Sequence, residues 1–186
     1  FRMVGPLYGA EVGLRADQIA IFLSAFVLGG ALAQLPAGWL ADRYDRRWVL
    51  IGMSIAALPA CGVTIAVSDM GTAAVMGAAF LFGLMTFPIY SISAAHAHDW
   101  AADHERVELS AALMFFYALG AIVAPLLTSN LITLYGPGAL FTFIAAAHLG
   151  LVAFGLIRMR RRASATTRAP YVWVPRTSFQ VGRIFR

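Results

Sequence analysis

The sequence predicts an all-α, polytopic transmembrane helix bundle, and three observations lead to this fold class. The first is composition: 60% of the chain is hydrophobic and 12% is charged, with a mean hydropathy of +0.75. That is more apolar surface than a soluble globule of this size can bury. The second is that no charged residue interrupts residues 18–41, 48–68, 70–98 or 109–157. The third is that the basic residues gather on one side of the predicted helices.

The uncharged segments are long enough for five membrane-spanning helices. A helix needs roughly 20 apolar residues to cross the hydrocarbon, and the sequence Tyr-Gly-Pro-Gly at 135–138 divides the longest segment. Helix is the only option, because an open sheet cannot satisfy its backbone polar groups in lipid. We expect spans at 17–41, 48–68, 71–97, 108–135 and 139–159, with cytoplasmic loops at 42–47 and 98–107.

The two ends of the chain lie outside these spans. Residues 1–10 are apolar apart from Arg2 but too short to cross, so we interpret them as the end of a truncated transmembrane helix. The start has no basic segment followed by a short apolar core and a cleavage site, so we expect no signal peptide. Residues 160–186 are rich in Ser, Thr, Arg and Pro, and we expect a cytoplasmic tail without a packed core.

All 14 basic residues are arginines, and their distribution predicts the orientation of the chain. In an alternating topology eight of them lie on one side, whereas the opposite loops hold only Arg15. The positive-inside rule makes the Arg-rich side cytoplasmic. This distribution also explains the net charge of +5 without a nucleic-acid partner, and we expect none. The eight are Arg43, Arg46, Arg47, Arg106, Arg158, Arg160, Arg161 and Arg162.

Small residues and prolines predict how the helices pack and bend. The first span carries a stripe of small residues at every fourth position, and such a stripe lets another helix approach closely. We expect this stripe, and the loop after it, to face a partner outside this chain. Prolines inside four spans predict bends. The stripe is Ala25, Gly29, Ala33, Ala37 and Ala41; the prolines are Pro36, Pro59, Pro88 and Pro125.

The loop after the first span carries the sharpest motif. It begins at Gly38 and continues through Asp-Arg-Tyr-Asp-Arg-Arg at residues 42–47. Glycine permits close helix contact, a carboxylate such as Asp42 accepts hydrogen bonds from a neighbouring helix N-terminus, and arginines pair with carboxylates or lipid phosphates. Such a loop can act as a conformational latch. The alternative is that its arginines only set the topology.

This loop resembles the signature loop of the major facilitator superfamily of secondary transporters, in which Gly, three residues, Asp, Arg and two residues precede basic residues. Asp45 stands where that family most often has a second Gly, so we expect the turn to differ. The resemblance implies that the loop holds the two halves of a transporter together on the cytoplasmic side in the outward-open state. The matching residues are Gly38, Asp42, Arg43, Arg46 and Arg47.

Two further stretches resemble the same superfamily. The segment from Tyr117 through Gly120 to Pro125 is similar to its rocker helix, and 87–99 with 174–177 resembles a poorly characterised branch of bacterial permeases that commonly has Asn in place of His98. The resemblance covers residues 3 to about 178. It implies the C-terminal six-helix half of a permease of the bacterial inner membrane, with the spans matching helices 8 to 12. Its partners are then the lipid bilayer and a missing N-terminal six-helix half.

The resemblance also implies which residues face the transported small-molecule solute, because helices 7, 8, 10 and 11 line the central cavity in this family. Arg2 is the candidate with the strongest physical argument. A charged side chain at membrane depth costs free energy, and it usually marks a transport pathway or a charged partner. It suggests an anionic solute or a carboxylate partner, unless it lies near the surface. Gln34 fits a hydrogen bond between helices as well as it fits a contact with the solute. The candidates are Arg2, Gln34, Tyr90, Ser91, Ser93, Tyr117 and Asn130.

The coupling ion is not evident from the sequence. No carboxylate lies in the interior of a predicted span. If protons drive transport, their carrier lies in the missing half or a histidine substitutes. His148 is in the middle of a span, but the resemblance puts that helix outside the cavity, so a packed or hydrogen-bonded role is favoured.

One polar cluster raises the question of catalysis. His96 and His98 are two residues apart, roughly 200° around a helix, so both cannot face one ion unless the helix has already ended. We interpret the cluster as an amphipathic cytoplasmic turn, and we expect no metal, no cofactor and no enzymatic activity. The alternatives are a non-transporting membrane subunit and, less favoured, a membrane-embedded metalloenzyme using His96, His98 and Asp99. The cluster comprises His96, His98, Asp99, Asp103, His104 and Glu105.

Overall fold

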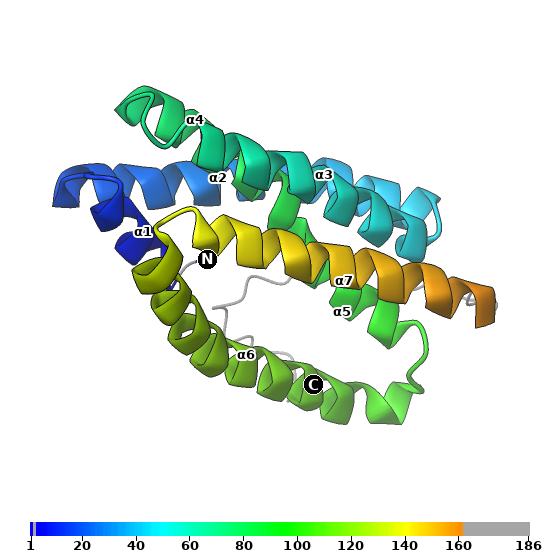
Figure 1. The fold of residues 1–186 in the computed structure, drawn as a ribbon. Coiled ribbons are helices and arrows are strands. Elements are labelled where there is room, and N and C mark those ends of the chain that lie inside the picture. Colours follow the sequence, from blue (N-terminus) through cyan, green and yellow to red (C-terminus); the bar gives the residue numbers. More distant parts are fainter. Residues whose placement is uncertain (2, 162–186) are drawn as a thin grey trace, which may run out of the picture.

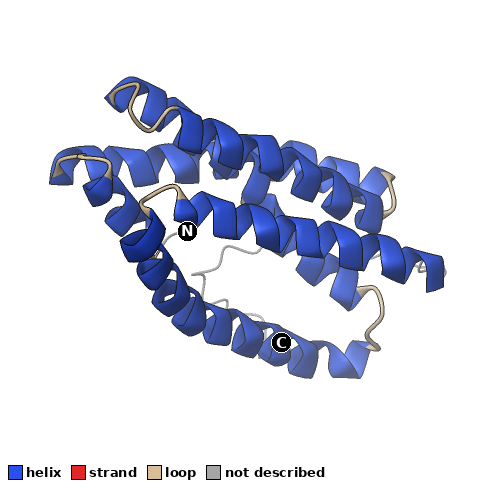
Figure 2. Ribbon diagram, in the orientation of Figure 1, coloured by secondary structure: helices blue, strands red, loops and turns tan. Residues whose placement is uncertain are grey.

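The computed structural model describes residues 1 and 3–161, which form a bundle of helices (Figure 1, Figure 2). Arg2 and residues 162–186, which include most of the expected tail, lie outside the described residues. The elements are α1 (Gly5–Glu11), α2 (Ala16–Arg43), α3 (Arg46–Ala66), α4 (Thr72–Thr86), α5 (Pro88–His98), the 3-10 turn η1 (Asp103–Glu105), α6 (Arg106–Tyr135) and α7 (Ala139–Arg161).

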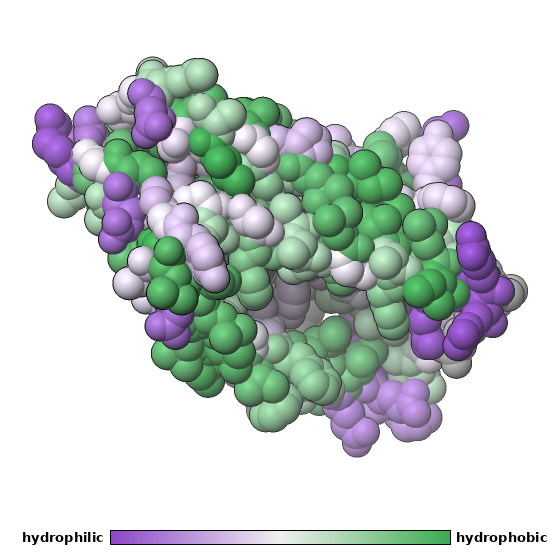
Figure 3. All heavy atoms as spheres, in the orientation of Figure 1, coloured by the Kyte–Doolittle hydropathy of each residue, from purple (hydrophilic) through white to green (hydrophobic). Residues whose placement is uncertain are grey.

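Five helical segments of the described chain are long and apolar enough to span a membrane. Figure 3 shows hydrophobic residues across the middle of one face and hydrophilic residues toward its two ends. Both observations confirm the predicted all-α membrane bundle. The segments are Ala16–Arg43, Arg46–Ala66, Thr72–His98, Asp103–Tyr135 and Ala139–Arg161.

The connection between α2 and α3 is shorter than the loop expected at 42–47. Helix α2 continues through Arg43 and α3 begins at Arg46, so only Tyr44 and Asp45 join them. The Asp45 carboxylate accepts a hydrogen bond from the backbone N–H of Arg47 at 3.0 Å and caps α3. Asp45 has a φ of −61°, which any residue adopts. The turn therefore does not need the glycine that the family most often has there.

The segment expected to be one span at 71–97 consists of two helices. Phe87 separates α4 from α5, and Pro88 is the first residue of α5. Proline has no backbone N–H to donate to the preceding turn, so the helix is interrupted at this point. Figure 1 shows α5 continuing below α4 at an angle to it.

Helices α2 and α4 touch through their backbones. A Cβ atom at Gly29 of α2 would overlap the carbonyl oxygen of Phe80, and one at Gly83 of α4 would overlap that of Phe26. Farther along the stripe, Ala37 and Ala41 are buried together with Val49 of α3 and Ile92 of α5. The small-residue stripe thus packs inside this chain. The expectation that it faces an outside partner was wrong, because a pattern of small residues marks a contact face without identifying its neighbour.

Aromatic rings fill the core at the opposite end of the bundle from the Arg-rich turn. Phe22, Phe82 and Phe141 bring α2, α4 and α7 together, and each is at most 1% exposed. Tyr8 of α1 packs edge-on against Phe141, with ring centroids 4.8 Å apart, and its hydroxyl donates to a backbone carbonyl of α3. This cluster holds α1 against the membrane-length helices.

Helix α6 packs least against the rest of the chain. Only 6% of its most apolar segment is buried, against 17–39% in the other four spans. It arches along the lower edge of the bundle in Figure 1 and contains Pro125, a residue type that bends helices. Its exposed side chains include Phe115, Phe116, Ile122 and Leu126. An apolar face of this size requires lipid or another set of helices to cover it.

Candidate functional site

Arg46 lies at the centre of an ion-pair network at the Arg-rich end of the bundle. Its side chain is 1% exposed. One terminal nitrogen, Nη1, donates to Asp99 Oδ1 at 2.6 Å and to the backbone carbonyl of Ala95 at 3.0 Å. The other, Nη2, donates to Asp42 Oδ1 at 3.3 Å. One guanidinium therefore joins the end of α2, the start of α3 and the end of α5.

The two acidic partners of Arg46 differ in their exposure. The Asp99 side chain is 3% exposed and that of Asp42 is 42% exposed. Withdrawing charges from water costs several kcal/mol per ion, and only good geometry with additional hydrogen bonds offsets that cost. The Ala95 carbonyl supplies such a bond, since the last carbonyls of a helix favour a cation. The Arg46–Asp99 pair is thus the buried part of the network, whereas Asp42 closes its solvent side.

The neighbouring arginines make separate contacts. Arg47 forms a bidentate pair with Asp45, in which Nη2 lies 2.7 Å from Oδ2 and Nε lies 3.2 Å from Oδ1. Arg43 is exposed, and its guanidinium lies over the ring of Trp39, 5.4 Å from the centroid. The N-terminus of α3 is capped by Asp45, which directly precedes that helix.

The predicted latch residues are therefore close in space but have different contacts. Gly38 is buried in α2, Asp42 and Arg46 belong to the network, and Arg43 and Arg47 lie at its edge. Asp99 is the member that sequence reasoning missed as a latch residue, because it was grouped with the histidines. A signal was present: Asp99 is the first charge after the uncharged segment 70–98, on the same predicted side of the membrane as Arg46.

The two histidines of the proposed catalytic cluster make contacts with different elements. His96 Nδ1 lies 4.0 Å from Asp99 Oδ2, whereas His98 Nε2 lies 3.3 Å from Ser110 Oγ of α6. Over residues 1 and 3–161, no three His, Cys, Asp or Glu side chains are grouped as metal ligands. This arrangement does not favour the metalloenzyme alternative.

Two of the candidate solute residues come together between α5 and α6. The rings of Tyr90 and Tyr117 meet edge to face with centroids 5.5 Å apart, and the Tyr90 hydroxyl lies 3.6 Å from the sulfur of Met114. Tyr117 also lines a cavity of about 390 Å³ between α6, the segment that precedes α1, and Phe26 of α2. The rocker residues Gly120 and Pro125 line the same cavity.

The other candidates are dispersed. Gln34 is 6% exposed within α2, and Ser91 is half-buried in α5. Asn130 is exposed and donates to the carbonyl of Leu126 in its own helix at 3.0 Å. Ser93 lines a second cavity, between α3, α5 and α7, because it lies two residues beyond Ser91 and therefore on another side of α5. Arg2 lies outside the described residues.

Comparison with known families identifies the family of this chain. The family described as the Major Facilitator Superfamily matches residues 1–185. The chain belongs to this superfamily. Among curated members, the chain is 30% identical over 165 residues to an uncharacterized transporter of Enterobacter sp. (strain 638), covering 89% of this chain and 41% of that protein. It is 31% identical over 175 residues to an uncharacterized transporter of Yersinia pestis (strain Pestoides F), and the match covers 91% of this chain and 42% of that protein. No solved structure gives a significant match.

Membership of the major facilitator superfamily confirms the resemblance found in the signature loop. It makes the chain a transporter-type integral membrane protein, in agreement with its five apolar spans. These relatives are bacterial and are described as uncharacterized transporters, in agreement with the resemblance to a poorly characterised branch. The chain spans about two fifths of the length of these relatives.

Proposed function

We propose that this chain forms the C-terminal six-helix half of a secondary transporter, which moves a small solute by alternating access between two helix bundles. Membership of the major facilitator superfamily and the five apolar spans support this function. Coverage of 41–42% of the relatives' length is in keeping with one of two halves. The weakly packed α6 supports it further, because its apolar face is available to a second bundle.

The observation that most directly supports the proposal is the network around Arg46. Alternating access requires the helices of one bundle to move together against the other. The buried Arg46–Asp99 pair and the contact to Asp42 connect α2, α3 and α5 at one membrane face. We assign Gly38, Asp42, Arg43, Arg46 and Arg47 to a latch at this face, with Asp99 as an additional member.

Arg43 is the latch residue best suited to contact the other half of the transporter. Its side chain is exposed, whereas those of Arg46 and Arg47 are largely buried and are paired with carboxylates of this chain. Guanidinium groups form bidentate pairs with carboxylates. A carboxylate of the N-terminal half can therefore pair with Arg43 when the halves meet at this face, and the pair separates when the face opens.

The solute path in this proposal runs along α6. Tyr117, Gly120 and Pro125 line a cavity there, and Tyr90 contacts Tyr117 from α5. Aromatic side chains provide apolar contact area together with a hydroxyl that fixes orientation. Gln34 and Asn130 are further candidate contacts.

The remaining parts of the proposal concern orientation and energy. We assign the Arg-rich face and the C-terminus to the cytoplasmic side of the bacterial inner membrane, on the basis of the arginine distribution. We assign proton coupling to groups of the N-terminal half, because Asp42 and Asp99 lie at span ends and are engaged with Arg46.

The test uses the complete reading frame in proteoliposomes. A solute that raises the melting temperature of the protein is selected from a library, and its uptake is measured with and without a pH gradient. We expect gradient-dependent uptake that the double variant Asp42→Asn/Arg43→Ala reduces at least tenfold, while membrane insertion is retained. Arg160→Gln, an exposed arginine at the same face, is the matched control. Absence of uptake by the wild type refutes the transport proposal, and undiminished uptake by the double variant refutes the latch.

A further inference from the structure

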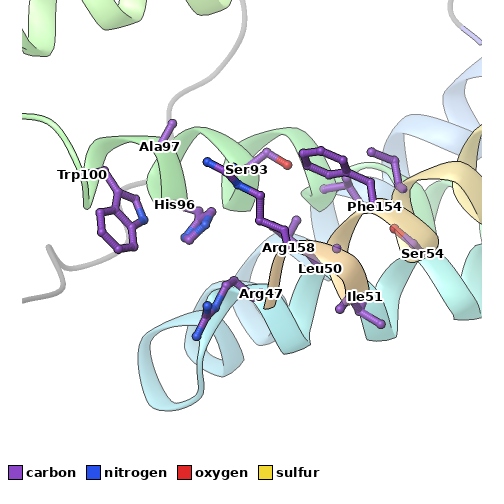
Figure 4. A pocket seen from close by; sticks show the side chains of 13 residues that line it. Arg47, Leu50, Ile51, Ser54, Ser93, His96, Ala97, Trp100, Phe154 and Arg158 are labelled. Atoms are coloured by element: carbon purple, nitrogen blue, oxygen red, sulfur yellow. The ribbon is translucent and has the colours of Figure 1, made fainter. Parts of the chain in front are cut away.

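A second cavity lies at the Arg-rich end of the bundle, between α3, α5 and α7. Its volume is about 660 Å³, and it is separate from the α6 cavity assigned to the solute. Figure 4 shows that it is bordered by side chains from these three elements. The resemblance implies that α3 and α7 pack outside the central cavity, so two of the three walls of this cavity lie away from the proposed solute path, and only α5, with Ser93, belongs to a cavity-lining span.

The rim of this cavity is basic and aromatic. Arg158 lies in the last turn of α7, Arg47 in the first turn of α3, and Trp100 two residues after the end of α5. The residues that line the cavity, all within the described chain, include no Asp or Glu. Arginine and tryptophan at the ends of spans are typical of the level of the lipid head groups. The rim thus lies where phosphate groups of the bilayer are found.

Arg158 is the cation that this rim offers to a ligand. The guanidinium of Arg47 is 2.7 Å from a carboxylate oxygen of Asp45, so its charge is balanced. None of the ion pairs formed within residues 1 and 3–161 involves Arg158. Figure 4 shows its side chain extending from α7 toward Ser93 and His96 of α5. The charge of Arg158 therefore lies over the cavity and is available to an anion.

Below the rim the cavity wall is apolar. Leu151 and Phe154 of α7, together with Ile51 of α3, form this wall. Leu151 and Phe154 are 50% and 64% exposed. At 1.5 Å of rise per residue, Leu151 lies roughly 10 Å from Arg158 along the helix axis. The lining therefore changes from cationic to apolar over a distance comparable with that between the phosphate and the upper acyl chain of a phospholipid.

We propose that this cavity binds an anionic phospholipid. Its phosphate pairs with the guanidinium of Arg158, and one acyl chain lies against Ile51, Leu151 and Phe154. Basic pockets between transmembrane helices bind anionic head groups in this way. A soluble phosphate would use only the rim, whereas a phospholipid uses both the rim and the wall. A zwitterionic lipid brings its own ammonium group near Arg158 and is expected to bind less well.

The test measures lipid retention by the chain in a neutral detergent. The protein is incubated with equal amounts of dioleoyl phosphatidylglycerol and dioleoyl phosphatidylethanolamine, and bound lipid is counted by native mass spectrometry. We expect the wild type to retain phosphatidylglycerol preferentially and Arg158→Gln to bind it about fivefold more weakly. Arg158→Lys should keep most of the preference, because it keeps the charge.

Matched variants separate a specific site from general charge attraction. Arg160→Gln removes an exposed arginine roughly 200° around the same helix from Arg158, and we expect lipid retention to be unchanged. Phe154→Ala should weaken retention of dioleoyl phosphatidylglycerol more than that of its dihexanoyl form. The melting temperatures of all variants are compared to verify that each is folded.

Three results would overturn the proposal. Equal retention of the two dioleoyl lipids by the wild type would exclude an anion-selective site. An equal loss in Arg158→Gln and Arg160→Gln would show attraction by the whole Arg-rich face. Full displacement of the lipid by millimolar inorganic phosphate would identify a site for a free anion. Because Arg158 is exposed and belongs to no latch contact, its replacement leaves the Arg46 network intact.

Discussion

Arg46 and Asp99 form an ion pair in which Nη1 lies 2.6 Å from Oδ1, although the two residues are 53 positions apart in the chain. Neither side chain is more than 3% exposed. A pair this well buried cannot exchange its partner for water without a large cost. The pair therefore fixes the end of α5 to the start of α3, and the contact of Arg46 with Asp42 adds α2 to the same unit.

Removing one member of this pair should destabilise the chain strongly. Asp99→Asn removes the buried carboxylate and leaves Arg46 with only the more exposed Asp42, and we expect a loss of about 3–5 kcal/mol in the free energy of unfolding. Equilibrium unfolding in mixed detergent micelles measures this loss. Asp42→Asn is the matched control, since its carboxylate is 42% exposed, and we expect less than about 1 kcal/mol. Equal losses in the two variants would contradict the assignment of Asp99 as the buried partner.

The contact between the backbones of α2 and α4 gives a second prediction. A methyl group at Gly83 would overlap the carbonyl oxygen of Phe26, which cannot move without displacing α2. Gly83→Ala should therefore destabilise the chain by about 1–3 kcal/mol, the usual cost of overpacking. Gly77→Ala, in the same helix, introduces a methyl group with nothing within 4 Å, and helix propensity predicts a small gain. Thermal denaturation of both variants in detergent measures the difference, and similar melting temperatures would contradict the close contact.

The number and type of the helices were predictable because lipid makes charge expensive. Uncharged segments indicate where helices cross the membrane, and the described residues contain the five membrane-length helical segments expected from them. The ends of helices depend instead on backbone hydrogen bonds, so α2 continues past the first charged residues to Arg43. In the same way Pro88 divides a span that composition alone makes continuous.

The site was less predictable than the helices, because its contacts join residues that are far apart in the sequence. A local motif identified Asp42 and Arg46, which are four residues apart. It contained no information on Asp99, whose approach to Arg46 depends on how α3 packs against α5. The small-residue stripe likewise predicted a packing face, but only the structure identifies α4 as its neighbour at Gly29. Pairings between distant residues are decided by three-dimensional packing, and a single sequence does not encode them as a readable pattern.

The turn between α2 and α3 gives a third prediction, based on the residue that departs from the family pattern. Asp45 caps α3 and pairs with Arg47. Asp45→Ala removes both contacts, and we expect a loss of about 1–2 kcal/mol in the free energy of unfolding. Asp45→Asn retains the cap without the charge, so its loss should be smaller. Thermal denaturation compares the variants with the wild type. A neutral effect of Asp45→Ala would contradict the capping role.

The orientation of the chain gives the last prediction. The single cysteine, Cys61, is 1% exposed and lies in the core, so a membrane-impermeant maleimide should label the unmodified chain poorly. Met70 lies in the turn between α3 and α4 and is 69% exposed, whereas Ala102 is exposed at the Arg-rich end, between α5 and α6.

We expect Met70→Cys to react in intact spheroplasts and Ala102→Cys to react only after the membrane is permeabilised. The physical reason is that the membrane potential and anionic lipids retain arginine-rich segments on the cytoplasmic side. Gel-shift analysis of the labelled protein distinguishes the two positions, and permeabilised membranes show that both cysteines are reactive. Labelling of Ala102→Cys in sealed spheroplasts would contradict the predicted orientation and place the Arg-rich end on the periplasmic side. The latch network and the lipid cavity would then both lie at the periplasmic face.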